Sequence, residues 1–203
     1  MRKGFGVCCI ILGICCLVLS LGLIAYNHRE EENAQNASEK ILQDVRENKL
    51  GYASEKGNGN EFEEISVGIS QEMLTVQVDG YDCIGVLSIP VLELELPVLT
   101  NWSYAKLKTA PCHYFGSYHE KDFVIAAHNY QSHFGRLSEL QPKDLILFTD
   151  ISGTVYCYEV VLLETLPANA TEEMITSGFD LSLYTCTLSG ASRVTVRCSA
   201  VGK

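Results

Sequence analysis

Apolar and polar residues follow three different patterns along this chain. Residues 4–26 form an uncharged, nearly unbroken apolar run, which is long enough to cross a hydrocarbon layer of about 30 Å as a helix. Segment 27–64 is polar and acidic, with almost no aromatic residues. From 65 to 203, short runs with β character are separated by proline, glycine and aspartate. This last pattern is typical of an all-β barrel or sandwich.

Basic residues lie before the apolar run and acidic residues lie after it. Arg2 and Lys3 precede the run, and a series of glutamates begins at Glu30. Because positively charged flanks stay in the cytoplasm, the N-terminus is expected inside and the rest of the chain outside the cell. The run is longer than the core of a usual signal peptide, and no small-residue cleavage site ends it. We therefore expect an uncleaved, single-pass signal anchor over 1–26, with a cleaved signal peptide as the alternative.

Segment 27–64 is predicted to be a polar extracellular tether between the membrane and a folded domain. Apolar residues at helical spacing permit a short amphipathic helix within 38–50. Gly57-Asn-Gly-Asn60 follows as a flexible break. The net charge of −10 leaves no basic surface for nucleic acid.

Residues 65–203 are predicted to form one mostly β domain, large enough to bury a core of its own. Strand character is found at 74–78, 84–89, 96–99, 123–127, 145–148, 154–161, 181–185 and 193–198. Short helical pieces are expected at 104–107, 136–140 and 172–177. The sequence contains no internal repeat, phosphate-binding loop or dinucleotide fingerprint.

The last two strand runs flank a small polar segment, 187–192, which contains Gly190. This pattern predicts an antiparallel hairpin in which Cys186 and Arg193 face each other, with Cβ atoms about 5 Å apart. A guanidinium that stays charged favours the thiolate, which is the reactive form of cysteine. The alternative is a buried structural cysteine beside a surface arginine.

His128 directly follows the continuously apolar run 123–127. A polar side chain at the end of a rigid strand is a candidate for chemistry. A hydrogen-bonded histidine with a structural role is the alternative, and His113, His119 and His133 compete with it. The sequence places no acidic residue to orient His128, so a Ser/His/Asp triad cannot be drawn.

Spacing limits the metal and disulfide chemistry of the chain. Five cysteines lie outside the apolar run, at positions 83, 112, 157, 186 and 198. An odd number leaves at least one thiol unpaired within the chain, and both two disulfides and five free thiols remain open. The C-x-x-C and H-x-x-x-H spacings of metal sites are missing. We therefore expect no metal and no cofactor.

A series of motifs occurs in a characteristic order. They are Ile84-Gly-Val-Leu-Ser-Ile-Pro90, Leu96-Pro-Val98, Pro111-Cys-His-Tyr-Phe-Gly-Ser117, Val124-Ile-Ala-Ala-His128, Phe134-Gly-Arg-Leu-Ser-Glu-Leu140, and Thr185-Cys186 followed by Arg193. In order and spacing they resemble the sortases, the cysteine transpeptidases that join proteins to the Gram-positive cell surface. The resemblance covers about 82–200. Its most specific parts are the strand-end histidine and the Thr-Cys pair followed closely by arginine.

The resemblance implies a mostly β fold, an eight-stranded sortase-type barrel with a few short helices after an N-terminal transmembrane helix. It implies Cys186 as the nucleophile, His128 as general acid and base, and Arg193 as the stabiliser of substrate and oxyanion. In the family, the cysteine cleaves an LPXTG-like sorting signal and forms a thioacyl-enzyme, which an amine then resolves. Arg197 shares one side of the strand with Arg193 and is the alternative candidate for the stabilising arginine.

Segment 164–180 corresponds, through this resemblance, to the loop that shapes the sorting-signal pocket. Leu166, Pro167 and Ala168, together with Thr185, are the expected substrate contacts, and the inner face of an ordinary loop helix is the alternative. Because the segment is short, the chain is similar to the compact class A or D sortases, with class B as a further possibility.

The expected partners are surface proteins with a sorting signal and an amine acceptor, either a cell-wall precursor or a pilin. Glu93 and Glu95 are similar to the calcium-binding residues of some sortases, but a solvated strand face is the favoured interpretation. Two other functions stay open. One is a thiol peptidase that transfers to water, and the other is an anchored β-domain that binds without catalysis.

Overall fold

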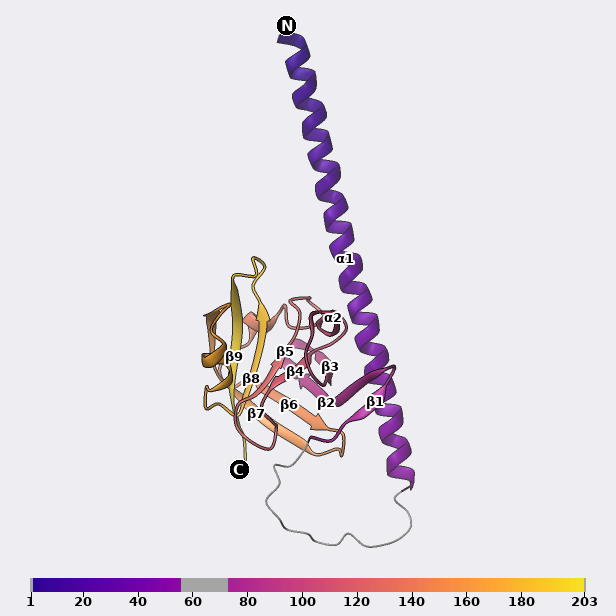
Figure 1. Cartoon of the computed structure of the whole chain (residues 1–203), viewed down its shortest axis with the longest axis vertical. Helices are drawn as coiled ribbons and strands as arrows, with labels where there is room; N and C mark the ends of the chain where they lie inside the picture. Colours follow the sequence, from indigo (N-terminus) through magenta and orange to yellow (C-terminus); the bar gives the residue numbers. More distant parts are fainter. Residues whose placement is uncertain (1, 56–72, 203) are drawn as a thin grey trace.

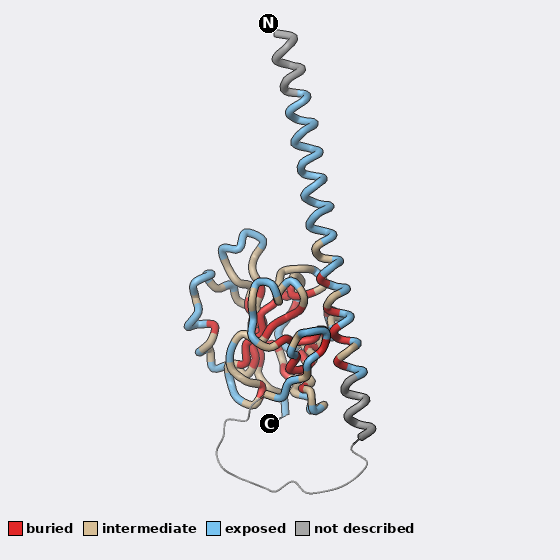
Figure 2. The backbone as a smooth tube through the Cα atoms, turned by 45° about the vertical axis from the view of Figure 1, so that its right-hand side comes forward, coloured by how far each residue is buried: buried red, intermediate tan, exposed pale blue. Residues whose placement is uncertain are grey.

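A long helix and a β-barrel make up the part of the chain that the structure describes. The computed structural model describes residues 2–55 and 73–202. Figure 1 shows the helix, α1 (Arg2–Glu55), lying beside the barrel and extending far beyond it. Apolar side chains from Ile10 onward are exposed there (Figure 2). Within the described residues, α1 is the one helix long and apolar enough to cross a membrane, which fits a membrane anchor.

α1 does not end where its apolar part ends. No glycine or proline occurs between Gly22 and Gly51, and alanine, glutamate, glutamine and lysine, which favour helix, are frequent there. The short helix expected within 38–50 is therefore part of one continuous helix that ends at Glu55. The flexible break expected at 57–60 and the domain boundary expected at 64 lie outside the described residues.

The barrel domain consists of short strands with few helical turns. The strands are β1 (Val76–Val78), β2 (Tyr81–Ile89), β3 (Leu94–Leu99), β4 (Cys112–Phe115), β5 (Phe123–Ala126), β6 (Leu145–Asp150), β7 (Val155–Pro167), β8 (Leu181–Cys186) and β9 (Ser192–Ala200). The helical elements are η1 (Pro90–Leu92), α2 (Tyr104–Leu107), η2 (Leu137–Glu139) and α3 (Thr171–Ile175). The helical pieces expected from the sequence correspond to α2, η2 and α3.

Strands β2 to β9 close into a barrel, and β1 forms a short hairpin with β2. The strand order is β1-β2-β3-β4-β5-β8-β9-β7-β6, and β2 also pairs with β6, which closes the sheet. This closure requires Gly85, because a Cβ at that position would collide with the carbonyl oxygen of Thr149 on β6. The expected eight-stranded barrel with few helices is therefore confirmed.

The sheet differs from the sequence expectation in two places. β4 was not expected as a strand, and it is held by antiparallel pairing with β5 and one parallel contact with β3. β7 was expected to end at 161 but continues to Pro167, because β9 supplies a pairing partner as far as Ser192. Residues 164–167 therefore belong to the sheet and not to the loop that follows it.

One face of α1 packs against the barrel beside β1 and β3 (Figure 2). The buried residues of this face, spaced at helical turns, are Ala34, Ser38, Ile41, Leu42 and Val45. Lys40 forms an ion pair with Asp79 at 2.8 Å, and Arg46 forms another with Glu95. The first half of the segment that the sequence suggested as a tether is thus a helix fixed to the domain.

β5 and β8 run side by side in parallel through the barrel. The four residues of β5 are all buried, as the continuous apolar run predicts. Ala126 and Tyr184 are partners in the β5–β8 register, so the two strands end at the same end of the barrel. Figures 1 and 2 show the β8–β9 turn at the end towards which the N-terminal part of α1 extends.

Candidate active site

The β8–β9 hairpin places Cys186 and Arg193 opposite each other. They are direct partners in the antiparallel register, as the sequence predicts. The loop between them is closed by the Thr187 N–H, which donates to the Ser192 carbonyl at 2.9 Å. Gly190 adopts a φ of 70°, a left-handed conformation that favours glycine. The short loop therefore fixes which residue faces the cysteine.

The Arg193 guanidinium is held by the backbone of its own loop. Nη1 donates to the carbonyls of Gly190 at 3.1 Å and Ser192 at 3.2 Å. Within the described residues the guanidinium makes no other hydrogen bond, so most of its donors remain available. Cys186 is a half-buried free thiol. A cation with unused donors thus faces a thiol across one ladder position.

His128 follows β5 at the same end of the barrel. The Ala127 N–H donates to the Tyr184 carbonyl at 3.2 Å, and the buried Thr185 hydroxyl donates to the Ala127 carbonyl at 2.9 Å. These bonds continue the β5–β8 pairing beyond the last strand residue. Because Ala126 pairs with Tyr184, two further steps along both chains bring His128 level with Cys186.

Asn129 and Tyr130 orient the His128 ring. Nδ1 lies 3.0 Å from the Asn129 backbone N–H and 2.9 Å from the Asn129 side-chain oxygen. The first contact fits the tautomer that is protonated on Nε2, and the second fits a ring protonated on Nδ1. Tyr130 stacks on the imidazole with ring centroids 4.1 Å apart and planes 6° apart. The ring is therefore held on one face and at one nitrogen.

The other three candidate histidines are held in different surroundings. His113 Nε2 donates to the Gly116 carbonyl at 2.8 Å, and burial lowers the pKa of His113. His119 Nδ1 lies 3.4 Å from the Tyr156 hydroxyl. His133 is fully buried, and this burial lowers its pKa to about 4. None of the four candidate histidines, His128 included, is among the residues that line the groove containing Cys186; His128 is distinguished by its place in the β5–β8 register.

A groove of about 210 Å³ contains Cys186 and Arg193. Four aromatic side chains line it, and sequence reasoning missed all of them. They are Trp102, Tyr104, Tyr114 and Tyr184. Neighbouring rings lie 5.3–5.6 Å apart, in edge-on or tilted contacts. They come from three separate segments, 102–104, β4 and β8, so no local sequence pattern reveals them together.

The predicted substrate contacts are distributed unevenly around this groove. Pro167 and Ala168 line it, and so does Met174 of α3. Leu166 pairs with Arg193 in the β7–β9 register but is not among the lining residues. Thr185 is buried and bonds to the backbone of the β5 end. Its side chain therefore holds two strands together and does not line the groove.

Arg197 has a structural position. It is only 2% exposed, and its guanidinium donates to the Glu164 carboxylate at 2.7 Å and the Ser182 hydroxyl at 2.8 Å. It also donates to two backbone carbonyls of α3. Four residues along a strand separate it from Arg193 by about 13 Å. Its donors are used by the protein, so Arg193 is the guanidinium available at the groove.

The five cysteines of the barrel are free thiols. Cys198 packs in the main core, as its strand position predicts, and Cys83 and Cys112 pack in a second cluster beneath α1. Burial raises the pKa of each of these three thiols to about 12. Only Cys157 and Cys186 are partly exposed.

We expect iodoacetamide at pH 8 to label Cys186 in the folded protein and to leave Cys83, Cys112 and Cys198 unlabelled. Those three thiols deprotonate only near pH 12, and the thiolate is the form that reacts. Peptide mass spectrometry after a short exposure measures the labelled fraction at each site. Labelling in urea is the control, in which all five sites react. Equal labelling of Cys198 and Cys186 in the folded protein would contradict this expectation.

Fold and site define a closed β-barrel with a thiol, a guanidinium and an imidazole at one end. The family model named Sortase domain matches residues 87–201, more than half of the chain. This chain therefore belongs to the sortase family, which confirms the resemblance seen in the sequence. No curated protein sequence gives a match.

Several solved sortase structures share the fold. Sortase A from Corynebacterium diphtheriae is 22% identical with a TM-score of 0.53, and the match covers 61% of this chain and 62% of that one. Sortase C from Streptococcus pneumoniae is 24% identical with a TM-score of 0.53, over 60% and 70% of the two chains. A sortase D5 transpeptidase from Clostridium perfringens is 17% identical with a TM-score of 0.57, over 84% and 99%.

Proposed function

We propose that this sortase is a membrane-anchored cysteine transpeptidase that cleaves an LPXTG-like sorting signal and transfers the cleaved protein to an amine. One observation carries the proposal. Cys186 and Arg193 oppose each other across the β8–β9 ladder, and His128 follows the neighbouring strand at the same end. A nucleophile, a cation and an acid–base group are the parts that this acyl transfer needs.

In the first half of the reaction, the Cys186 thiolate attacks the carbonyl carbon of the scissile peptide bond. The unused N–H groups of Arg193 stabilise the oxyanion of the tetrahedral intermediate. When the intermediate collapses, the leaving amine takes a proton from Nε2 of the His128 imidazolium. The products are a thioacyl-enzyme, a released amine and a neutral imidazole.

In the second half, an amine acceptor attacks the thioester. Nε2 of His128 accepts the proton that the amine loses, and the Cys186 thiolate leaves again. This step uses the tautomer in which Nδ1 donates to the Asn129 side-chain oxygen, because Nε2 is then free to take a proton. The imidazolium and the thiolate are thereby restored for the next cycle.

The groove offers an apolar surface for the leucine and proline of a sorting signal. Its aromatic wall and the Pro167–Ala168 end of β7 are the proposed contacts. Leu166 and Thr185 lie next to these contacts in the strands and hold the neighbouring backbone in place. The single short helix between β7 and β8 suits a compact class A- or D-like enzyme.

The proposed location is the cell membrane, with a single pass of α1. Arg2 and Lys3 before the apolar part and glutamates after it favour a cytoplasmic N-terminus and an extracellular barrel. The proposed partners are surface proteins with a sorting signal and an amine on a cell-wall precursor or a pilin.

A panel of fluorogenic LPXTG-type peptides, assayed with the full chain in detergent micelles, tests the proposal. We expect cleavage of at least one peptide, and a peptide–amine product when an amine is added. Cleavage whose products do not change with added amine would instead indicate a thiol peptidase. No cleavage of any peptide, together with an unreactive Cys186, would favour a binding domain without catalysis.

A further inference from the structure

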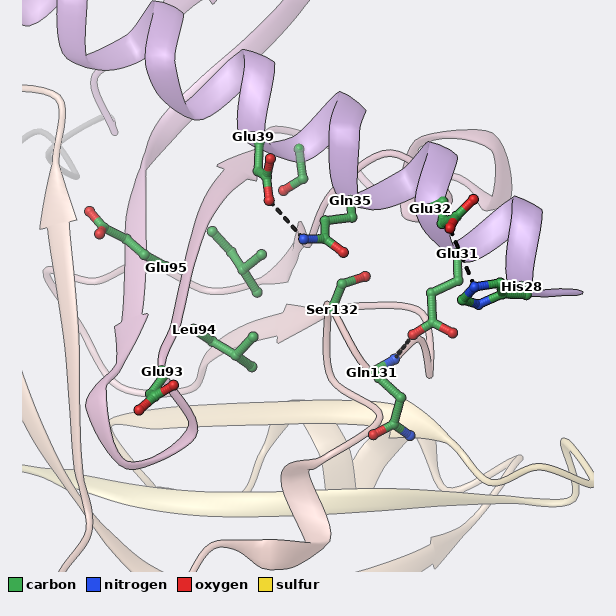
Figure 3. Close-up of a pocket in the computed structure, with 12 residues that line it drawn as sticks. His28, Glu31, Glu32, Gln35, Glu39, Glu93, Leu94, Glu95, Gln131 and Ser132 are labelled. Carbon is green, nitrogen blue, oxygen red and sulfur yellow. Dashed lines mark hydrogen bonds and ion pairs between the residues drawn. The ribbon is translucent and has the colours of Figure 1, made fainter.

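A second and larger cavity lies between α1 and the barrel. Its volume is about 540 Å³, and it shares no lining residue with the Cys186 groove. Figure 3 shows that its walls come from three segments, which are one side of α1, the start of β3 with the residue before it, and the loop after β5. This size lies within the range of small-molecule sites in proteins.

The cavity is strongly acidic. Five carboxylates line it, and no lysine or arginine does; they belong to Glu31, Glu32, Glu39, Glu93 and Glu95. Within the described part of the chain, only Glu95 forms an ion pair with an arginine, and Glu32 contacts the His28 ring at 3.3 Å. Glu31 and Glu39 accept hydrogen bonds from neutral amides at 2.6 and 2.8 Å. Arg136 also interacts with Glu93 through its charge, which leaves Glu31, Glu32 and Glu39 without a lysine or arginine partner among the described residues, and the cavity attracts cations.

Two serine hydroxyls add unused hydrogen-bonding groups. Ser38 on α1 is 3% exposed, and its Oγ has no partner among the described residues. Ser132, in the loop after β5, likewise has a buried Oγ without a partner there. Both residues line the cavity. Leaving a buried hydroxyl unpaired is destabilising, so a ligand group that reaches it gains a hydrogen bond at little cost.

The arrangement of the lining residues favours an organic cation over a metal ion as the ligand of this cavity. Within residues 10–47 and 73–202, no three His, Cys, Asp or Glu side chains converge as metal ligands do, so the carboxylates surround the space and do not share one point. Leu94 and Leu96 supply an apolar wall beside them. Carboxylates, hydroxyls and an aliphatic wall together match an ammonium group on a methylene chain, as in a lysine side chain.

We propose that this cleft, the cavity between α1 and the barrel, docks the lysine-type ammonium group of the amine acceptor. The proposal rests on the proposed function, because it assigns a site to the second substrate. The wall formed by Gln131 and Ser132 lies three and four residues after His128 in the same loop. An acceptor held there by its side-chain ammonium keeps another amine free for the thioester.

L-lysine amide and L-norleucine amide are the matched probes. Both carry an α-amine on the same backbone, and only lysine amide carries an ammonium at the end of its side chain. We expect the full-length Cys186→Ala protein, which measures binding without turnover, to bind lysine amide about tenfold more tightly than norleucine amide in a calorimetric titration. With the unaltered enzyme, the KM of lysine amide in peptide transfer should be lower by a similar factor.

The variants Glu39→Gln and Glu93→Gln remove charge from opposite walls, and together they should abolish the preference for lysine amide. Glu47→Gln is the control, because Glu47 is exposed on the same helix but does not line the cleft. Ser38→Ala should weaken lysine amide binding while raising the thermal midpoint of the free protein, since it removes an unpaired buried hydroxyl. A hydroxyl that no ligand uses would raise the midpoint and leave binding unchanged.

The two proposals fail in distinguishable ways. Equal binding of the two probes, or a preference that survives the double substitution, would overturn the docking site even if peptide transfer is observed. Lysine-selective binding that Glu39→Gln and Glu93→Gln abolish, without any peptide turnover, would support the cleft as an ammonium site and reject the transfer function. Cleavage of the peptide in the absence of amine should be the same in all the glutamate variants.

Discussion

We expect Cys186→Ala to abolish peptide cleavage and transfer, with a loss of at least about 10³-fold in kcat/KM. Alanine has no atom that can attack the scissile carbonyl, and no other thiol lines the groove. Folding should be unaffected, because Cys186 is half-buried and makes no disulfide. The measurement is turnover of the best peptide from the panel, with circular dichroism as the check on folding.

Cys198→Ala is the matched control. It removes the same chemical group from the same hairpin, but Cys198 is fully buried in the core and does not line the groove. We expect nearly unchanged turnover and a modest loss of stability from the small cavity. Turnover that persists in the Cys186→Ala protein would end the assignment of the nucleophile.

Alanine substitutions at Arg193 and Arg197 have opposite consequences. We expect Arg193→Ala to lower kcat/KM by about 10²–10³-fold, the typical effect of removing an oxyanion donor, and to leave stability nearly unchanged. Arg197→Ala removes a buried guanidinium that bonds to Glu164, Ser182 and two backbone carbonyls. Because several buried acceptors lose their donor, we expect unfolding to become easier by about 3 kcal/mol.

Thermal unfolding and turnover, measured on both variants, separate the two roles. Arg193→Lys should recover only part of the activity, since lysine keeps the charge but loses the planar fork of donors. If Arg197→Ala proved stable but inactive while Arg193→Ala remained active, the assignment of the two arginines would be reversed.

The closing hairpin could be predicted in detail, because its information is local. A short loop that contains Gly190 fixes the register, and the register alone sets Cys186 against Arg193. β5 could be predicted equally well from the sequence, since a strand buried on both faces is continuously apolar. Strand alternation, however, places Arg193 and Arg197 on the same side of β9. It does not indicate which of the two side chains another element buries. The covering element is α3, which folds back from a distant part of the chain.

The remaining differences arise from contacts between distant segments. β4 is a strand because β5 lies beside it, and its four residues carry no alternating pattern. The groove wall joins Trp102, Tyr114 and Tyr184 through tertiary contacts. The apolar stripe of α1 is visible in the sequence as a helical period, but the surface that it covers is not. The length of α1 and its packing on the barrel therefore had to come from the structure.

The continuity of α1 bears on how the enzyme meets its substrates. A helix rises 1.5 Å per residue, so the stretch from Asn27, where the apolar run has ended, to Ala34, where barrel packing begins, spans only about 10 Å of unbroken helix. A domain attached to the membrane through a continuous helix reorients less freely than one attached through a flexible linker. Once α1 is inserted in a bilayer, the β8–β9 end faces the lipid headgroups. Lateral diffusion and surface density, more than bulk concentration, would then set the rate of productive encounters.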